Sequence, residues 1–192
     1  LYDWSACRLA YKVLLPEKVH VKFFVNTFGI KEDKFIQIYT GANDVVFKPM
    51  PEVPKTQNFT VHFHGNFIPL QGVDYIVEAA SILKEEDIEF QLIGSGGELY
   101  ERIQNTVAER ELTKVHLVGR KPLEEVVEWI NRAHVCLGVF GDTGKTKRVI
   151  SNKIYECIAS GQPLITSRTP ATAELFTDGE NVLFAEVANG QD

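Results

Sequence analysis

Residues 59–184 alternate short apolar runs with segments that carry helix signals. The apolar runs predict strands, and apolar positions at three- and four-residue steps predict helices. The expected strands are 59–63, 88–93, 115–118, 135–140, 164–166 and 182–184, and the expected helices are 72–83, 99–111, 123–133 and 171–176. This alternation predicts an α/β fold with a Rossmann-like, doubly wound parallel sheet, because right-handed crossovers place helices on both faces of the sheet.

One more helix is expected after the run at 135–140, separated from it by a polar loop. Ser151 can cap this helix, and Ser160 followed by Gly161 ends it. Ile154, Cys157 and Ile158 form its expected buried stripe, with Glu156 off that stripe. A loop that leaves a parallel strand and feeds a helix is where open α/β sheets bind nucleotides and other anions.

The first 53 residues have a different pattern. They predict a helix at 1–10, a strand at 13–15, a helix at 17–28 stopped by Gly29, and a strand at 35–39. Residues 41–57 contain three prolines and several turn formers, as an exposed segment between domains does. We therefore expect a boundary near Pro54, with 1–53 as the tail of a preceding domain and 54–192 as the Rossmann-like domain. The absence of an initiating Met suggests a cut fragment.

Composition excludes some classes of function. The chain has 192 residues, 44% hydrophobic and 24% charged, as a globular protein does. A net charge of −6 with scattered basic residues argues against general nucleic-acid binding. Three cysteines without CxxC spacing predict buried thiols and a cytoplasmic location. Apolar runs fall short of the ~20 residues of a membrane span, and the start of the chain lacks the basic residues of a signal peptide. A peripheral membrane contact stays open.

Two small motifs have structural and functional interpretations. The glycine-rich turn at 94–97 either lets backbone approach a ligand or only turns tightly, and Leu99 stands where a dinucleotide fingerprint has its last glycine. We favour the structural role. His62 and His64 face the same side of their predicted strand. Since a third ligand at a recognisable spacing is missing, packing or surface roles are favoured over a metal site.

Residues 139–146 differ from the phosphate-binding G-x-x-x-x-G-K-T loop only at Val139. A nest of backbone amides with Lys145 suits phosphate, but an apolar strand ending in Asp, which would hold magnesium, does not follow. This loop is the basis of our alternative hypothesis, a phosphate- or nucleotide-binding regulatory module without transfer activity. Glu156 is either a solvated helix-start carboxylate or a ligand-binding one.

Most of the chain resembles the donor-binding half of GT-B glycosyltransferases, glycosyltransferase family four (glycosyl transferases group 1). The family signature E-A-x-A-x-G-x-P-V-I, P-E, D-G-x-N-G-x-L is matched from Glu156 onward through Pro163, Glu174 and Asp178. Weaker matches, specific only in their combined order, lie at 41–49, 65–72, 92–96 and 115–119.

The resemblance implies transfer of a sugar from a nucleotide-sugar to an acceptor such as a glycan or lipid-linked saccharide, with retained configuration and neither metal nor separate cofactor. The sequence has no D-x-D motif. The preceding domain would then be the tail of an acceptor-binding N-terminal domain, and the donor domain would be truncated at its C-terminal end. Since most of the acceptor half is missing, we expect this fragment alone to be inactive. The whole enzyme would be cytoplasmic or at the inner face of a membrane.

Site residues follow from the same resemblance. Glu156 would bind the ribose hydroxyls, backbone around Gly94, Gly119 and Arg120 would frame the base, and the loop at 141–148 would face the diphosphate and sugar. The predicted nucleotide-sugar site comprises Gly65, Asn66, Gln71, Gly94, Gly119, Arg120, Lys145, Arg148, Lys153 and Glu156.

The chain departs from the family where charge matters most. The family's diphosphate-binding Arg and Lys fall at Asn66 and Gln71, and its first glutamate falls at Arg148. A basic loop with Lys145, Lys147 and Arg148 follows, then Lys153. Either the cations moved to this loop, with Arg148 and Lys145 stabilising the leaving group, or the loop is merely solvated.

Overall fold

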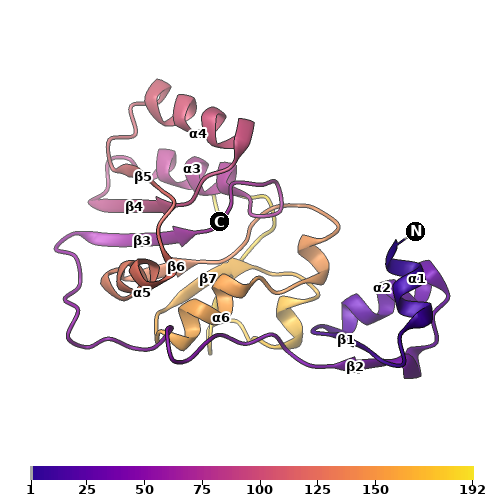
Figure 1. Cartoon of the computed structure of the whole chain (residues 1–192). Coiled ribbons are helices and arrows are strands. Elements are labelled where there is room, and N and C mark those ends of the chain that lie inside the picture. Colours follow the sequence, from indigo (N-terminus) through magenta and orange to yellow (C-terminus); the bar gives the residue numbers. More distant parts are fainter. Residues whose placement is uncertain (1) are drawn as a thin grey trace.

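A computed structural model describes residues 2–192. The first part contains α1 (Tyr2–Leu9), β1 (Val13–Leu15), α2 (Lys18–Phe28), a 3-10 turn at Glu32–Lys34 and β2 (Phe35–Gln37), with β1 and β2 paired in parallel. This part forms its own lobe in Figure 1. Gly29 ends α2 in the left-handed conformation, with φ at 63°, as the sequence predicts.

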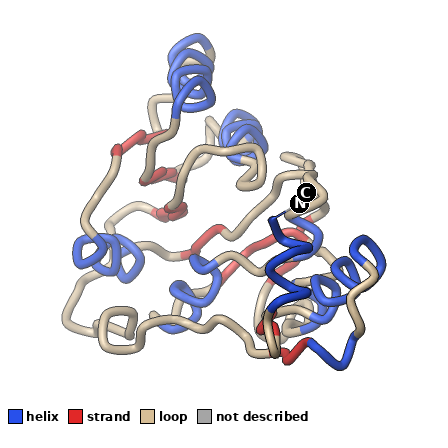
Figure 2. Tube along the Cα trace, turned by 45° about the vertical axis from the view of Figure 1, so that its right-hand side comes forward, coloured by secondary structure: helices blue, strands red, loops and turns tan. Residues whose placement is uncertain are grey.

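The second part is built on one sheet of six parallel strands, flanked by helices (Figures 1 and 2). Its strands run in the order β5-β4-β3-β6-β7-β8, so the chain moves outward from β3 and then returns to β6 on the opposite side of β3. The carboxyl ends of β3 and β6 are therefore the topological switch point, where open α/β sheets hold their ligands. The elements are β3 (Phe59–His64), α3 (Val73–Ile82), β4 (Ile88–Ile93), α4 (Gly97–Glu109), β5 (Val115–Gly119), α5 (Leu123–Arg132), β6 (Val135–Leu137), a 3-10 turn at Thr146–Arg148, α6 (Asn152–Ala159), β7 (Leu164–Ser167), a 3-10 turn at Thr172–Glu174 and β8 (Leu183–Ala185).

Successive side chains of each strand point to opposite faces of the sheet, so the core consists of two layers. Val61 and Phe63 of β3 join the cluster under α3 and α4, whereas Cys136 of β6 joins the cluster under α5 and α6. His62 and His64 alternate with Val61 and Phe63 along β3 and are buried, so they lie on the side of α5 and α6. This confirms the prediction that the two histidines share one side of their strand.

The doubly wound fold is confirmed, and several predicted ends are wrong. The strand predicted at 135–140 stops at Leu137, although Val139 and Phe140 beyond it stay buried. The helix predicted at 171–176 is only the 3-10 turn at Thr172–Glu174. The predicted start of the first helix at Leu1 lies outside the described residues. Smaller shifts occur in the elements predicted at 17–28, 35–39, 99–111 and 182–184, which are Lys18–Phe28, Phe35–Gln37, Gly97–Glu109 and Leu183–Ala185.

Two predictions about α6 are also wrong. Ser151 occupies the N-cap position, but its side chain makes no capping hydrogen bond. Ile158 is 39% exposed, whereas Ile154 and Cys157 are completely buried. The buried face of α6 is shifted toward its start, because Lys153 rather than Ile158 completes it. All three cysteines are buried and free, as predicted.

Two carboxylates join the first part of the chain to the second. Glu174 accepts hydrogen bonds from the backbone N–H groups of Lys18 (2.7 Å) and Val19 (2.6 Å) at the start of α2. Glu17 is fully buried and accepts from the N–H of Ile150 at 2.8 Å. The two bonds to Glu174 satisfy amides that the start of α2 leaves unpaired. Among residues 2–192, no helix is long and apolar enough to cross a membrane. The boundary near Pro54 stays a prediction.

Candidate functional site

Three glycines bring backbone segments into close contact at the carboxyl ends of β3, β4 and β5. The N–H of Gly65 donates to the carbonyl of Ile93 at 2.9 Å, and the N–H of Gly94 donates to the carbonyl of Gly119 at 2.9 Å. A Cβ at Gly94 would lie 1.8 Å from the Gly65 carbonyl oxygen, and φ at Gly94 is 152°. A residue with a side chain therefore cannot replace Gly94. We call the contacting backbone of Gly65, Gly94 and Gly119 the glycine floor.

Asn66 and Arg120 each follow a glycine of this floor, and their side chains contact each other. The guanidinium of Arg120 donates to the side-chain carbonyl of Asn66 at 3.1 Å, and both side chains are exposed. The structure therefore places a guanidinium beside Asn66, the residue that the resemblance aligns with the family's arginine.

Gln71 and Lys153 form the second such pair. The ammonium of Lys153 donates to the side-chain carbonyl of Gln71 at 2.5 Å and lies 3.7 Å from the centre of the Phe63 ring. A Cβ at Gly65 would lie 2.7 Å from this ammonium, so Gly65 leaves room for it. Lys153 is 3% exposed, and burial lowers its pKa to about 7. A lysine thus lies beside Gln71, the residue that the resemblance aligns with the family's lysine.

Glu156 is held by a histidine that the sequence did not connect with it. The imidazole Nε2 of His64 lies 2.8 Å from Oε2 of Glu156, and His64 Nδ1 lies 2.9 Å from Nε2 of His62. The Glu156 side chain is 18% exposed, and burial raises its pKa. Burial and, secondarily, the charge of Lys153 lower the pKa of His64 to about 3, so this imidazole is neutral. The only sequence signal for this contact was the position of His64 at the end of a predicted strand, directly before the loop at 65–72.

The basic loop at 141–148 lies beside the loop at 65–72, but its cations have different surroundings. The hydroxyl of Thr146 donates to the carbonyl of Leu70 at 3.3 Å. Lys145 is exposed, and Lys147 pairs with Asp142 at 2.6 Å. The guanidinium of Arg148 lies 3.8 Å above the Phe23 ring of α2. The structure therefore directs Arg148 toward the first part of the chain.

The same loop does not have the geometry of a triphosphate-binding loop. Such a loop continues directly into a helix at its Lys-Thr pair. Here Thr146–Arg148 is one 3-10 turn, and α6 begins only at Asn152. Among residues 2–192, no group of three or more His, Cys, Asp or Glu side chains could hold a metal ion.

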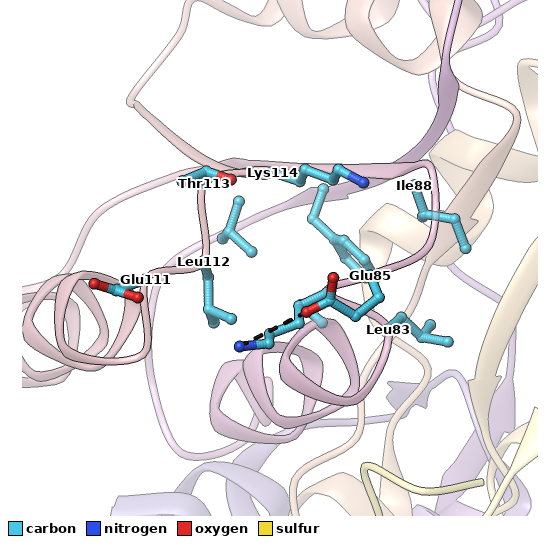
Figure 3. A pocket seen from close by; sticks show the side chains of 11 residues that line it. Leu83, Glu85, Ile88, Glu111, Leu112, Thr113 and Lys114 are labelled. Carbon is cyan, nitrogen blue, oxygen red and sulfur yellow. Dashed lines mark ion pairs between the residues drawn. The ribbon is translucent and has the colours of Figure 1, made fainter.

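Figure 3 shows a pocket at the opposite end of the sheet, where the strands begin. It opens at the amino ends of β4 and β5, between the ends of α3 and α4, and Leu83, Ile88 and Leu112 contribute apolar side chains to it. The predicted site residues lie at the carboxyl ends of the strands, so this pocket is separate from them.

Comparison with known proteins agrees with this architecture. Residues 58–192 match the family model described as glycosyl transferases group 1. An uncharacterized glycosyltransferase of Methanocaldococcus jannaschii is 30% identical over 161 residues, which are 84% of this chain and 42% of that protein. The probable glycosyltransferase WbjE of Pseudomonas aeruginosa is 26% identical over 157 residues, 80% of this chain and 38% of that protein. The chain thus spans less than half of these relatives.

Solved structures share the fold at low identity. Anabaena HepE, in complex with UDP and glucose, superposes with a TM-score of 0.83 at 16% identity and covers 97% of this chain and 52% of its own. A mutant of S. aureus TarM, in complex with fondaparinux, alpha-GlcNAc-glycerol and UDP, has a TM-score of 0.79 at 14% identity, covering 100% of this chain and 37% of its own. The fold is that of the C-terminal domain of GT-B glycosyltransferases. The family match, the relatives and the fold together show that this chain belongs to the glycosyl transferases group 1 family.

Proposed function

We propose that this chain is the nucleotide-sugar-binding half of a hexosyl-type glycosyltransferase. The observation that carries the proposal is the position of Glu156, a carboxylate with one oxygen held by His64, the residue directly before Gly65 of the glycine floor. An ionised carboxylate with a second oxygen available can accept hydrogen bonds from two adjacent ribose hydroxyls. The floor of glycines lets a base lie close to backbone groups.

The diphosphate would be met by cations from three segments. Arg120 beside Asn66 would supply one of the charges that positions 66 and 71 lack. Lys153 beside Gln71 would supply the other, because a bound anion raises the pKa of a neighbouring lysine. Lys145 and Arg148 remain candidates for stabilising the leaving group, Arg148 after it leaves the Phe23 ring. A diphosphate gains negative charge as the glycosidic bond breaks, and fixed cations lower the energy of that state.

Transfer would need the rest of the enzyme. An acceptor and a donor must be held together with water excluded, and the other wall of that site belongs to the N-terminal domain. We therefore propose that the fragment binds the donor without transferring the sugar, that the donor alone suffices without a metal or cofactor, and that transfer retains configuration. The acceptor class remains a glycan or lipid-linked saccharide, in the cytoplasm or at the inner face of a membrane.

Thermal unfolding with a ligand panel tests the proposal. UDP, GDP, ADP and dTDP, their glucose or mannose derivatives, and ATP would each be added with magnesium and with EDTA. A ligand that binds only the folded chain raises the unfolding temperature. We expect one nucleoside diphosphate and its sugar derivative to stabilise the chain equally with magnesium and with EDTA. Stabilisation by ATP only with magnesium would favour the regulatory-module hypothesis instead.

A further inference from the structure

Four side chains and one backbone carbonyl form a continuous line of hydrogen bonds that ends on Glu156. The line begins at the carbonyl oxygen of Trp129 in α5, which lies 3.0 Å from Nε2 of Gln91. The same Nε2 lies 3.1 Å from Nδ1 of His62. His62 Nε2 then meets His64 Nδ1 at 2.9 Å, and His64 Nε2 meets Glu156 Oε2 at 2.8 Å.

The direction of this line follows from its first member. A backbone carbonyl can only accept, so the Gln91 atom facing Trp129 must be the NH2 group, and its second N–H points at His62 Nδ1. That nitrogen is then the acceptor of a neutral imidazole, which places the proton of His62 on Nε2. His62 donates to Nδ1 of His64, so the proton of His64 also lies on Nε2 and is donated to Glu156.

The surroundings keep both imidazoles neutral. His62 is completely buried and His64 is 9% exposed. Burial lowers the pKa of both rings, and the ammonium of Lys153 adds to the effect for each. A neutral ring has one donor and one acceptor nitrogen, so a single donor at the start of the line fixes every later proton.

We propose that Gln91, His62 and His64 act as a positioning relay that presents a fixed N–H to one oxygen of Glu156 and leaves its other oxygen for the ribose. This inference rests on the proposed function, because the ribose contact belongs to it. His64 is a positioning residue, since it reaches the ligand only through Glu156. The relay is a way to hold a half-buried carboxylate in one orientation through an uncharged hydrogen-bond donor.

The proton positions can be observed directly. The ¹⁵N shifts and couplings of histidine rings distinguish a protonated Nε2 from a protonated Nδ1, and they can be read from the chain labelled at histidine. We expect both His62 and His64 to carry the proton on Nε2 at neutral pH. A proton on Nδ1 of His64 would overturn the relay, because Nε2 would then accept from a protonated Glu156.

Binding of the best nucleoside diphosphate from the thermal panel tests the functional part. His64→Leu removes the donor and should weaken binding on the order of tenfold. His64→Gln keeps an N–H near the position of Nε2 and should restore most of the affinity. The matched control is His116→Leu, which removes another strand histidine paired with a glutamate, Glu89, outside this line. It should leave the affinity unchanged, and thermal unfolding of each variant verifies that it is folded.

The outcomes separate the relay from the proposed function. If Glu156→Ala weakens binding but His64→Leu does not, the relay is refuted and the proposed function stands. If the wild-type chain binds none of the four diphosphates, the proposed function fails and the positioning role fails with it. Weakened binding in His64→Leu, recovery in His64→Gln and protons on both Nε2 atoms together establish the relay.

Discussion

At the scale of single residues, the proposed ribose contact depends on Glu156. Replacing Glu156 with alanine should weaken binding of the nucleoside diphosphate by about 1.5–3 kcal/mol, the usual cost of losing hydrogen bonds to a charged group. The 2′,3′-dideoxy analogue should lose little further affinity on the same substitution, because the partner hydroxyls are already gone. Calorimetric titrations of the wild type and of Glu156→Ala, each with the normal and the dideoxy diphosphate, give the four affinities of this double-perturbation cycle.

The control for that cycle is Glu180→Ala, which removes an exposed glutamate from the turn before β8. Its affinity should match that of the wild type. Equal losses for the normal and the dideoxy ligand in Glu156→Ala would contradict a ribose contact and leave Glu156 as a helix-start carboxylate.

Lys153 should make stability depend on pH. Its pKa is about 7 in the folded chain, below the ordinary value of 10.5 for lysine. Between these values the unfolded chain binds the extra proton, so the free energy of unfolding should rise as pH rises from about 7 to 10. Chemical denaturation of the wild type and of Lys153→Met across this range isolates the effect as a difference. A difference that is flat with pH would mean that Lys153 is an ordinary solvated lysine.

Residue roles were only partly predictable from the sequence. The helix pattern placed Glu156 off the buried stripe, and the resemblance gave it a role, but nothing in the order of residues linked it to His64, 92 positions earlier. That contact depends on how α6 packs against the face of β3 that carries His64. Lys153 was expected at the site, yet its burial depends on the space that Gly65 leaves, which no periodicity encodes.

At the scale of elements, the two pairs of cations can be compared. Arg120→Ala with Lys153→Met removes the charges beside Asn66 and Gln71. Lys145→Ala with Arg148→Ala removes two charges of the basic loop and leaves Lys147, which pairs with Asp142. We expect the first pair to abolish most of the difference in affinity between a nucleoside diphosphate and its nucleoside, since its members lie beside the glycine floor. The second pair should have a smaller effect, because Arg148 stacks on Phe23.

Titrations for this comparison should be made at one low salt concentration, because exposed charges are screened over about 10 Å at 0.1 M ionic strength. Uridine or the matching nucleoside serves as the reference ligand in each variant. If the loop pair erases the preference and the first pair does not, then the cations have moved to the basic loop, as one of the two sequence-based alternatives holds.

The type of an element could be predicted where the apolar pattern repeated over a long segment. The prediction failed for the short segment at 171–176. The ten residues of α3 bury four apolar positions on one face, and its pattern was unambiguous. The segment at 171–176 is too short for a repeated stripe, and Thr172 instead uses its hydroxyl to bond the carbonyl of Ser167 at 3.0 Å. Competition of that kind between a threonine side chain and the backbone shortens a helix.

At the scale of the whole molecule, the sheet order explains why distant residues converge. The strand order reverses at β3, because β4 and β5 lie on one side of it and β6 lies on the other. The loops that follow β3, β4 and β5 therefore meet the start of α6 at the carboxyl end of the sheet. The first part of the chain is held to the second by the carboxylates of Glu17 and Glu174. We propose that this end of the sheet, and not another surface, receives the nucleotide.

The most direct test is a map of backbone amide shifts in the ¹⁵N-labelled chain during titration with the nucleoside diphosphate selected by the thermal panel. We expect saturable shifts at the amides of Gly65, Gly94 and Gly119 and along the start of α6, with little change at Leu112 and Thr113 beside the pocket in Figure 3. Shifts gathered around that pocket, or confined to the basic loop while the three glycines stay unmoved, would contradict the proposal.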